Sequence, residues 1–188
     1  MGSLDAVPAA DRPDLLAPPT AAALAANVVP PAETGVAEID PDVADTAAFC
    51  ERYRVRMDES ANCVVVAGRR GGETTLAACV ILATTRADVN GVVRRHLGVR
   101  KASFAPVEVA VEATGMEYGG ITPVGLPTGW PVLIDSAVAA APRVVIGSGL
   151  RRSKLTLPGA ALAALPGAEV LDGLARLAFM IVGSGGGL

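Results

Sequence analysis

The chain has 188 residues, of which 51% are hydrophobic, 3% aromatic and 19% charged, a composition typical of one globular domain with a short extension. No apolar run reaches the roughly 18 residues that a membrane-spanning helix needs, and six aromatic residues are few for a surface that stacks RNA bases. The net charge of −3 averages an acidic first part (residues 1–60, 11 acids and 4 bases) with a basic remainder (residues 61–188, 8 acids and 12 bases), which is compatible with a polyanionic partner.

The first 60 residues predict a flexible leader followed by three elements. Seven of the 14 prolines lie within the first 41 residues, so residues 1–19 are expected to form a flexible Pro/Ala-rich leader. A short helix capped by Thr20 is expected over 20–26 and a strand over 36–39. A second helix is expected over 42–53, with Asp42 as its N-cap.

The middle of the chain predicts a hairpin, a helix and a strand. Two apolar runs, over 62–67 and 75–83, flank a glycine-rich turn and indicate a β-hairpin. Asp88 is expected to cap a helix that ends before Gly98, and a strand follows over 101–105.

The last part of the chain alternates short strands with short helices. Pro106 opens a predicted helix that Gly115 ends, and an irregular segment follows over 116–130. Further elements are expected as strands over 131–135, 143–146, 155–157 and 168–171, a helix after Pro158 and a flexible glycine-rich tail over 183–188. Because hairpins and helices occur together, the predicted fold class is α+β with a mixed sheet.

Cysteine and histidine content excludes several kinds of site. The three cysteines, Cys50, Cys63 and Cys79, form no close pair and predict reduced, mostly buried thiols in a cytoplasmic protein. Their spacing and the single histidine do not fit a zinc site, so no metal is expected. His96 is expected at a helix end, which argues against a Ser/His/Asp or Cys/His hydrolase, and Cys63 as a nucleophile lacks an evident base.

Two glycine-rich segments could carry chemistry. Residues 144–152 contain Gly147-Ser148-Gly149 after a strand, but no helix is expected to follow, so a β-turn is favoured over a nucleotide-binding loop. Residues 118–127 form a Gly/Pro-rich stretch whose fixed backbone amides could stabilise an oxyanion. A mere connecting loop remains the alternative for this stretch.

The segment Gly119-Gly120-Ile121-Thr122-Pro123-Val124-Gly125, followed by the strand at 131–135 and the run Val145-Ile146-Gly147-Ser148-Gly149, resembles the YbaK/EbsC family. That family is similar to the editing domain inserted in bacterial prolyl-tRNA synthetases. Residues 85–98 are also similar to its Asp-containing strand-to-helix turn, and the resemblance covers residues 42–172. It implies a compact α+β fold around a mixed, barrel-like sheet with surrounding helices, in a single editing domain over 20–182.

The resemblance also implies an activity and a partner. The expected reaction is hydrolysis of a mischarged aminoacyl-tRNA in trans, assisted by the substrate's own groups and requiring no cofactor. The expected partner is the acceptor end of a mischarged tRNA, with an aminoacyl-tRNA synthetase as a further partner, and neither a membrane nor DNA. The implied catalytic positions are Gly119, Gly120 and Asn62. The implied substrate-binding positions are Ile121, Thr122, Pro123, Asp88, Gly147, Ser148 and Gly149. The basic residues expected to contact tRNA phosphates are Arg94, Arg95, Arg100, Lys101, Arg151 and Arg152.

One position departs from the family pattern. The family usually has a lysine where this chain has Asn62, and asparagine offers hydrogen bonds but no charge. Two hypotheses therefore stay open. The protein is a deacylase in which Asn62 serves a different substrate or a neighbouring arginine supplies the cation, or it is a non-catalytic binding module of the same fold.

Overall fold

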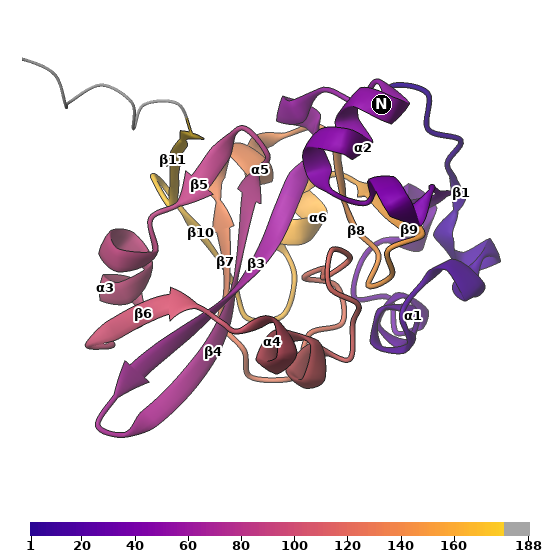
Figure 1. Cartoon of the computed structure of the whole chain (residues 1–188). Helices are drawn as coiled ribbons and strands as arrows, with labels where there is room; N and C mark the ends of the chain where they lie inside the picture. The colour runs from indigo at the N-terminus through magenta and orange to yellow at the C-terminus, as the bar shows by residue number, and fades with distance from the viewer. Residues whose placement is uncertain (179–188) are drawn as a thin grey trace, which may run out of the picture.

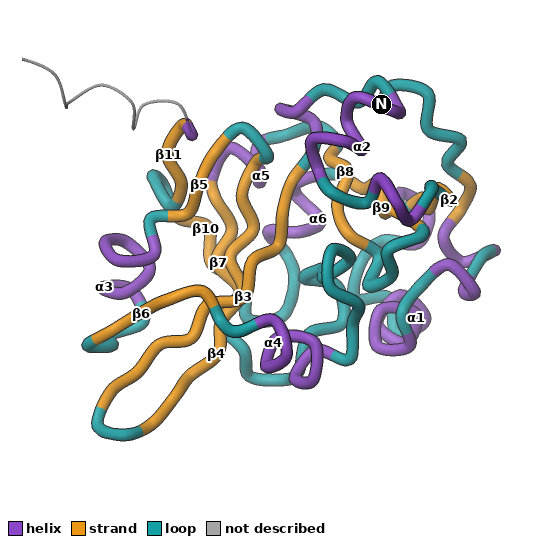
Figure 2. The backbone as a smooth tube through the Cα atoms, in the orientation of Figure 1, coloured by secondary structure: helices purple, strands orange, loops and turns teal. Residues whose placement is uncertain are grey.

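Two β-sheets form the centre of the molecule, and short helices surround them (Figures 1 and 2). The computed structural model describes residues 1–178. The first sheet has the order β1 (Val7–Pro8), β2 (Gly35–Glu38), β9 (Ser153–Leu157), β8 (Val144–Gly147). The second has the order β10 (Ala168–Leu171), β7 (Val132–Asp135), β4 (Glu73–Leu82), β3 (Ala61–Arg70), β6 (Lys101–Phe104). A separate pair joins β5 (Thr85–Ala87) and β11 (Ala175–Leu177).

The strands pair in both directions, which confirms the predicted mixed sheet. All pairs of the first sheet are antiparallel, whereas β7 is parallel to both β4 and β10. A parallel bridge between Ser60 and Val145 connects the two sheets at the start of β3. This connection brings β8 and β9 beside the first residues of β3.

The helices are short. The α-helices are α1 (Pro18–Ala25), α2 (Thr46–Tyr53), α3 (Arg94–His96), α4 (Val107–Thr114), α5 (Ser136–Ala140) and α6 (Gly159–Ala163). The 3-10 turns are η1 (Ala9–Asp11), η2 (Pro13–Leu15), η3 (Pro31–Glu33), η4 (Pro41–Val43) and η5 (Met57–Glu59), and η6 (Val89–Val93) is a π-helical turn. No helix within residues 1–178 has both the length and the apolar character needed to cross a bilayer.

The β3–β4 hairpin is the longest regular element and matches the prediction. Its two strands pair along their whole length, from Ala61 opposite Leu82 to Arg70 opposite Glu73. Gly71 and Gly72 close it with positive φ angles of 58° and 85°, which favour a tight two-residue turn of the type I′ class. The predicted helix between Pro106 and Gly115 is also confirmed as α4, which Gly115 ends in a left-handed conformation.

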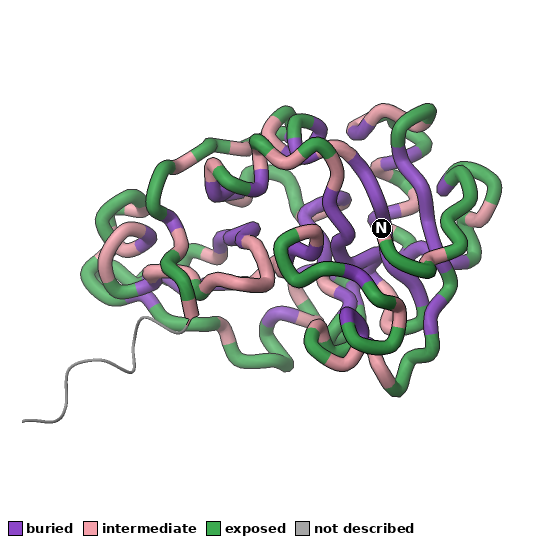
Figure 3. Tube along the Cα trace, turned by 90° about the horizontal axis from the view of Figure 1, so that it is seen from above, coloured by how far each residue is buried: buried purple, intermediate pink, exposed green. Residues whose placement is uncertain are grey.

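The buried strands form a largely aliphatic core (Figure 3). The largest cluster of buried residues contains leucine, isoleucine, valine and alanine side chains and no aromatic ring. A second cluster lies between the β3–β4 hairpin, η6 and Leu174, and a third surrounds Phe49 of α2. The small number of aromatic residues is therefore no obstacle to a packed interior.

The expected flexible leader is instead a packed segment. β1 pairs with β2, and the side chains of Leu15 (1% exposed) and Leu16 lie in the largest core cluster. The Ser153 hydroxyl also donates a hydrogen bond to the Leu15 carbonyl. The proline-rich composition alone predicted flexibility. Burial of these apolar side chains instead compensates the loss of conformational entropy when the segment becomes ordered. The expected tail over 183–188 lies outside the described residues.

Three helix boundaries also differ from the predictions. The first helix begins at Pro18, so Thr20 lies inside it and its buried hydroxyl has no partner within residues 1–178. The helix expected over 42–53 is divided, because Asp40 and Asp45 each cap a separate turn. The helix capped by Asp88 starts as the π-helical turn η6 before it continues as α3.

Candidate active site

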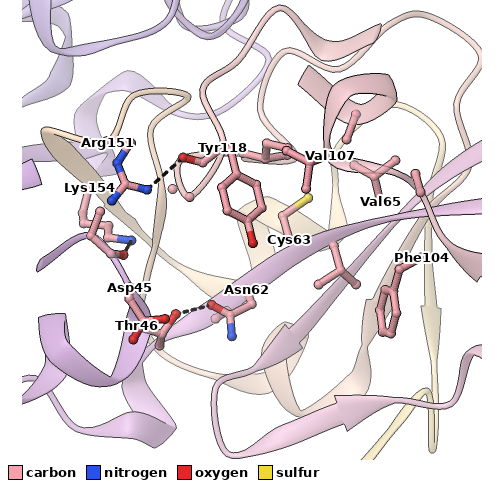
Figure 4. A pocket seen from close by; sticks show the side chains of 18 residues that line it. Asp45, Thr46, Asn62, Cys63, Val65, Phe104, Val107, Tyr118, Arg151 and Lys154 are labelled. Carbon is pink, nitrogen blue, oxygen red and sulfur yellow. Dashed lines mark hydrogen bonds between the residues drawn. The ribbon is translucent and has the colours of Figure 1, made fainter. Parts of the chain in front are cut away.

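A pocket of about 420 Å³ opens where the two sheets meet (Figure 4). Its walls come from the start of α2, the first half of β3, the β6–α4 connection, the loop after α4, and the turn between β8 and β9. The volume falls within the range of natural ligand sites. The lining residues are Ala44, Asp45, Thr46, Ala61, Asn62, Cys63, Val64, Val65, Phe104, Ala105, Val107, Ala110, Tyr118, Gly119, Ile121, Gly147, Arg151 and Lys154.

The loop after α4 is fastened to the β8–β9 turn by hydrogen bonds. The Gly149 amide donates to the Gly120 carbonyl at 2.7 Å, and the Glu117 amide donates to the Gly149 carbonyl at 2.9 Å. The Glu117 carboxylate accepts from the Arg151 amide at 2.9 Å. The two glycine-rich segments of the sequence are therefore parts of one structure.

Four glycines in this structure, Gly119, Gly120, Gly147 and Gly149, leave no room for a Cβ unless a neighbour moves, and Gly147 and Gly119 illustrate the reasons. A Cβ on Gly147 would clash with the carbonyl oxygens of Gly120 and Ile121. Gly119 has a φ of +84°, and a Cβ there would clash with the Arg151 guanidinium. Both positions therefore require glycine, the first for close packing and the second also for its backbone conformation.

Two backbone amides of the loop have no hydrogen-bond partner in the described part of the chain. The amide groups of Gly119 and Ile121 donate no hydrogen bond to any residue within 1–178, and both residues line the pocket. The Gly120 amide, by contrast, donates to the Glu117 carbonyl at 3.0 Å. Fixed, unpaired amides at a pocket wall suit the stabilisation of negative charge on an oxygen atom.

Arg151 holds the loop in place. Its guanidinium donates to the Tyr118 carbonyl and to the Pro41 carbonyl, both at 3.1 Å, so it connects the loop to the segment before α2. Tyr118 (61% exposed) and Phe104 (59% exposed) lie at the pocket mouth on either side of Cys63 (Figure 4). Their exposed rings offer apolar surface to whatever enters.

Asn62 points toward α2. Its side-chain oxygen accepts a 2.7 Å hydrogen bond from the Thr46 hydroxyl, and its NH2 group has no partner within residues 1–178. Asp45, next to Thr46, uses its carboxylate to cap α2 by accepting from the Ala47 amide at 3.2 Å. Asn62 therefore presents a neutral hydrogen-bond donor to the pocket.

Lys154 is the pocket residue that the sequence analysis missed. It is the second residue of β9 with 8% of its surface exposed, and its Nζ donates to the Ala44 carbonyl at 3.3 Å and lies 5.1 Å from the Phe49 ring centroid. Burial, with a smaller contribution from the Arg151 charge, lowers the pKa of Lys154 to about 8, while Cys50 and Asp45 oppose the shift. A lysine inside a strand whose five residues are all buried was the available signal.

Cys63 lines the pocket but is a poor nucleophile. Burial raises the pKa of its thiol far above the ordinary value, and the neighbouring Cys79 raises it further. The thiol is therefore protonated at neutral pH, and only the thiolate is reactive. This agrees with the prediction from the lack of a base.

Several predicted site residues lie outside this pocket. Thr122 is buried beneath the loop, and Pro123 lines a second cavity beside Trp130. The Ser148 hydroxyl hydrogen-bonds to Ser153 inside the turn. Asp88 caps η6 and forms an ion pair with Arg176 at 3.1 Å, as part of a different region.

Most of the predicted phosphate-binding residues also lie elsewhere. Arg100 and Lys101 gather with Arg69 and Arg70 around the tip of the β3–β4 hairpin. Arg94 and Arg152 make contacts within the protein, whereas the Arg95 side chain in α3 has no hydrogen bond or ion pair within residues 1–178. Arg94 donates to the Asn90 carbonyl, Arg152 donates to the Asp14 carbonyl, and His96 lies 2.9 Å from Glu169. Of the six predicted basic residues, Arg151 is the one that lines the pocket.

The described part of the chain holds no group of three or more histidine, cysteine or acidic side chains that could bind a metal ion.

A family model for the aminoacyl-tRNA editing domain matches residues 40–165, which are 126 of the 188 residues. The chain belongs to this family. The resemblance carried by the Gly119–Gly125 segment is thereby confirmed at the level of the family.

Solved structures confirm the fold of this editing domain. A structure described as a candidate trans-editing enzyme for prolyl-tRNA synthetase has a TM-score of 0.64 and 24% identity, covering 74% of this chain and 85% of that chain. A scaffold used for computational epitope grafting has a TM-score of 0.70 and 22% identity, covering 83% and 95%. A hypothetical protein has a TM-score of 0.66 and 21% identity, covering 75% and 90%. A comparison with curated proteins finds no match.

Proposed function

We propose that this editing domain hydrolyses the ester of a mischarged aminoacyl-tRNA in trans, in the pocket between β3 and the Gly119–Ile121 loop. The observation that carries the proposal is the convergence of two unpaired backbone amides, a neutral amide side chain and a buried lysine on one pocket. An ester carbonyl that becomes negatively charged during hydrolysis needs donors of this kind. The family match supplies the substrate class.

The reaction we propose uses few protein side chains. Water adds to the ester carbonyl carbon, and the amides of Gly119 and Ile121 donate to the carbonyl oxygen. The bond from that carbon to the ribose oxygen then breaks, and the proton lost by water ends on the departing oxygen. Because the pocket has no histidine, the neighbouring ribose hydroxyl of the substrate assists the proton transfer.

The pocket wall suggests the kind of amino acid removed. Val65, Val107, Ala110 and Cys63 present apolar surface, so a small or medium apolar side chain fits best. A pocket of this kind separates substrates that differ by one methylene by about 10–200-fold. The exposed rings of Tyr118 and Phe104 at the mouth would contact the terminal nucleotide.

A panel of mischarged aminoacyl-tRNAs tests the proposal. The purified protein should release the amino acid from at least one member of the panel faster than buffer alone, and the release should follow side-chain size. Binding of the same tRNAs is measured in parallel by filter retention. Intact binding without turnover on any member would overturn the proposed activity.

The alternative is a non-catalytic binding module, and Asn62 is the observation that favours it. Its oxygen is occupied by Thr46, and it carries no charge. If the parent protein is inert and Asn62→Lys gains hydrolysis, the alternative is supported. An active parent that loses turnover on Gly119→Ala excludes it. For either function we propose a cytoplasmic tRNA partner, with an aminoacyl-tRNA synthetase as a second partner whose presence would raise the apparent affinity.

A further inference from the structure

Lys154 occupies a position that is unfavourable for a lysine. It is the second residue of a five-residue strand that is buried throughout, and its side chain lines the pocket wall across from Asn62 (Figure 4). A cation in such a place requires a partner, because transfer of a charge out of water is costly unless the charge is paired. The contacts of Nζ therefore decide what Lys154 does.

The protein itself satisfies little of the ammonium group. No salt bridge from residues 1–178 reaches Nζ, and of its three protons one is used, in a long hydrogen bond to the Ala44 carbonyl. The Phe49 ring adds a cation–π contact on one side. Because Lys154 lines the pocket, an oxygen atom of a bound ligand would accept a hydrogen bond from one of the two unused N–H groups.

The charged and titratable groups around Nζ do not neutralise it. Asp45 is committed to the cap of α2, and the Cys50 thiol has a raised pKa, so it is protonated at neutral pH. Arg151 brings a second positive charge from the β8–β9 turn. The pocket lining thus holds two cations, Lys154 and Arg151, and one carboxylate, Asp45, and this excess of positive charge suits an oxygen that gains negative charge.

The choice of residue type adds a separate argument. The chain has 14 arginines and two lysines, Lys101 and Lys154, so composition alone would favour an arginine at a basic position in the pocket. Arg151, three residues earlier, shows what arginine does here, since its planar fork binds two carbonyls and holds the loop. The compact ammonium of Lys154 can instead point a single donor at one oxygen atom.

We propose that Lys154 is a catalytic residue of this pocket, whose ammonium donates a hydrogen bond to the ester carbonyl oxygen and stabilises its negative charge while water attacks. The inference rests on the proposed ester hydrolysis. Lys154 keeps its proton throughout, while the water and the departing ribose oxygen exchange theirs as described above. It thereby supplies, from β9, the positive charge that Asn62 cannot supply from β3.

The proposal makes a statement about pH. Burial places the pKa of Lys154 near 8, so the ammonium form dominates below that value and is lost above it. The rate of hydrolysis should therefore rise less steeply above about pH 8 than the spontaneous reaction of the same ester. Lys154→Arg keeps its charge at every pH used and should not show this bend.

Steady-state deacylation by Lys154→Met, Lys154→Arg and the parent tests the inference. Loss of one charge-stabilising donor typically lowers kcat by about 10²–10³-fold, and we expect that loss for Lys154→Met with KM changed less than threefold. Lys154→Arg should recover at least a tenth of the parent rate. Arg86→Met, which removes an exposed cation from β5, should match the parent.

A second measurement on the parent protein covers the case in which the variants do not fold. With 13C-lysine incorporated biosynthetically, the two lysines give two sets of side-chain signals, which Lys101→Arg assigns. One set should titrate near pH 8 and shift when a tRNA acceptor microhelix carrying a 3′-aminoacyl amide is added. Two results would overturn this inference and leave the proposed function standing. One is an active parent whose Lys154→Met variant keeps kcat within threefold. The other is a Lys154 signal that titrates near 10.5 and does not shift when the microhelix is added. A parent that hydrolyses no aminoacyl-tRNA would overturn the proposed function and this catalytic role together.

Discussion

Gly147 of β8 packs directly against the carbonyl of Gly120, so closely that a Cβ on Gly147 would overlap its oxygen. This contact sets the distance between the first sheet and the loop that carries the unpaired amides. The shape of the pocket therefore depends on a position that contributes no side chain of its own.

Gly147→Ala should displace the loop. The φ of Gly147 is not positive, so the effect is steric, and overpacking of this kind typically costs about 1–3 kcal/mol of unfolding free energy. We expect such a loss in urea unfolding and a fall in deacylation of at least tenfold. Gly173→Ala, at a glycine with a φ of +68° and open space around it, is the control that adds backbone strain without a steric clash. Equal activity of Gly147→Ala and the parent would show that the loop position is not critical.

Arg151→Met should make the Gly119–Ile121 loop more mobile, while Lys154 remains as a cation in the pocket lining. The substitution removes the hydrogen bonds to the Tyr118 and Pro41 carbonyls, which tie the loop to the segment before α2. Exchange of the Gly120 amide, which donates to the Glu117 carbonyl, should become faster, because local opening of the loop requires fewer bonds to break. Exchange in the β3–β4 hairpin serves as the internal reference. Unchanged protection of the loop would mean that the backbone bonds to Gly149 suffice.

Lys154→Met should stabilise the protein at neutral pH. The pKa of Lys154 is lowered from 10.5 in the unfolded chain to about 8 in the folded state, so the folded state disfavours the charged form. Between pH 8 and 10.5 the unfolded chain binds more protons, and the parent's unfolding free energy gains with rising pH from this group. We expect Lys154→Met to raise the unfolding free energy by about 1–3 kcal/mol at pH 7 and by less as the pH approaches 10.5.

Urea unfolding of both proteins at pH 7 and near pH 10 measures this difference. Lys101→Met, which removes an exposed lysine on β6, should change the unfolding free energy by less than about 0.5 kcal/mol at either pH. A destabilised Lys154→Met variant, or a difference independent of pH, would contradict the account of an unfavourable buried cation. The expected result would mean that Lys154 lowers stability and is explained by function.

The tip of the β3–β4 hairpin should contribute to tRNA affinity. Arg69, Arg70, Arg100 and Lys101 meet there, and each cation that contacts a phosphate steepens the dependence of binding on salt. The double variant Arg100→Gln, Lys101→Gln should bind tRNA more weakly and reduce the slope of log K against log salt by about 1–2. Arg86→Gln is the control with the same chemical change at a single site. A slope equal to that of the parent would assign tRNA binding to another surface.

Sequence reasoning succeeded where the signals are local. The β3–β4 hairpin follows from two apolar runs around Gly71 and Gly72, and α4 follows from Pro106 and Gly115. The family could also be identified from the Gly119–Gly125 segment. Its glycines are required by backbone conformation or close packing, and glycine at these positions is visible in the sequence.

It failed where the outcome depends on distant contacts. Residues 1–19 look flexible from their prolines, and only the docking of Leu15 and Leu16 on the first sheet orders them. Lys154 follows the basic residues Arg151 and Arg152 closely in sequence, yet it pairs within β9 with its side chain buried, while Arg152 reaches the Asp14 carbonyl. Thr122 and Pro123 are adjacent to pocket residues in sequence but face the interior and a second cavity.

The most direct test of the pocket compares two glycines of the same loop. Gly119 and Gly129 have nearly the same φ, +84° and +86°, so alanine strains the backbone equally at both. A Cβ at Gly119 would displace the Arg151 guanidinium that holds the loop with the unpaired amides, whereas a Cβ at Gly129 meets open space. Deacylation of a mischarged aminoacyl-tRNA is measured for both variants and the parent. The account predicts at least a hundredfold loss of kcat for Gly119→Ala and parent-like turnover for Gly129→Ala. Equal rates for the two variants would contradict it.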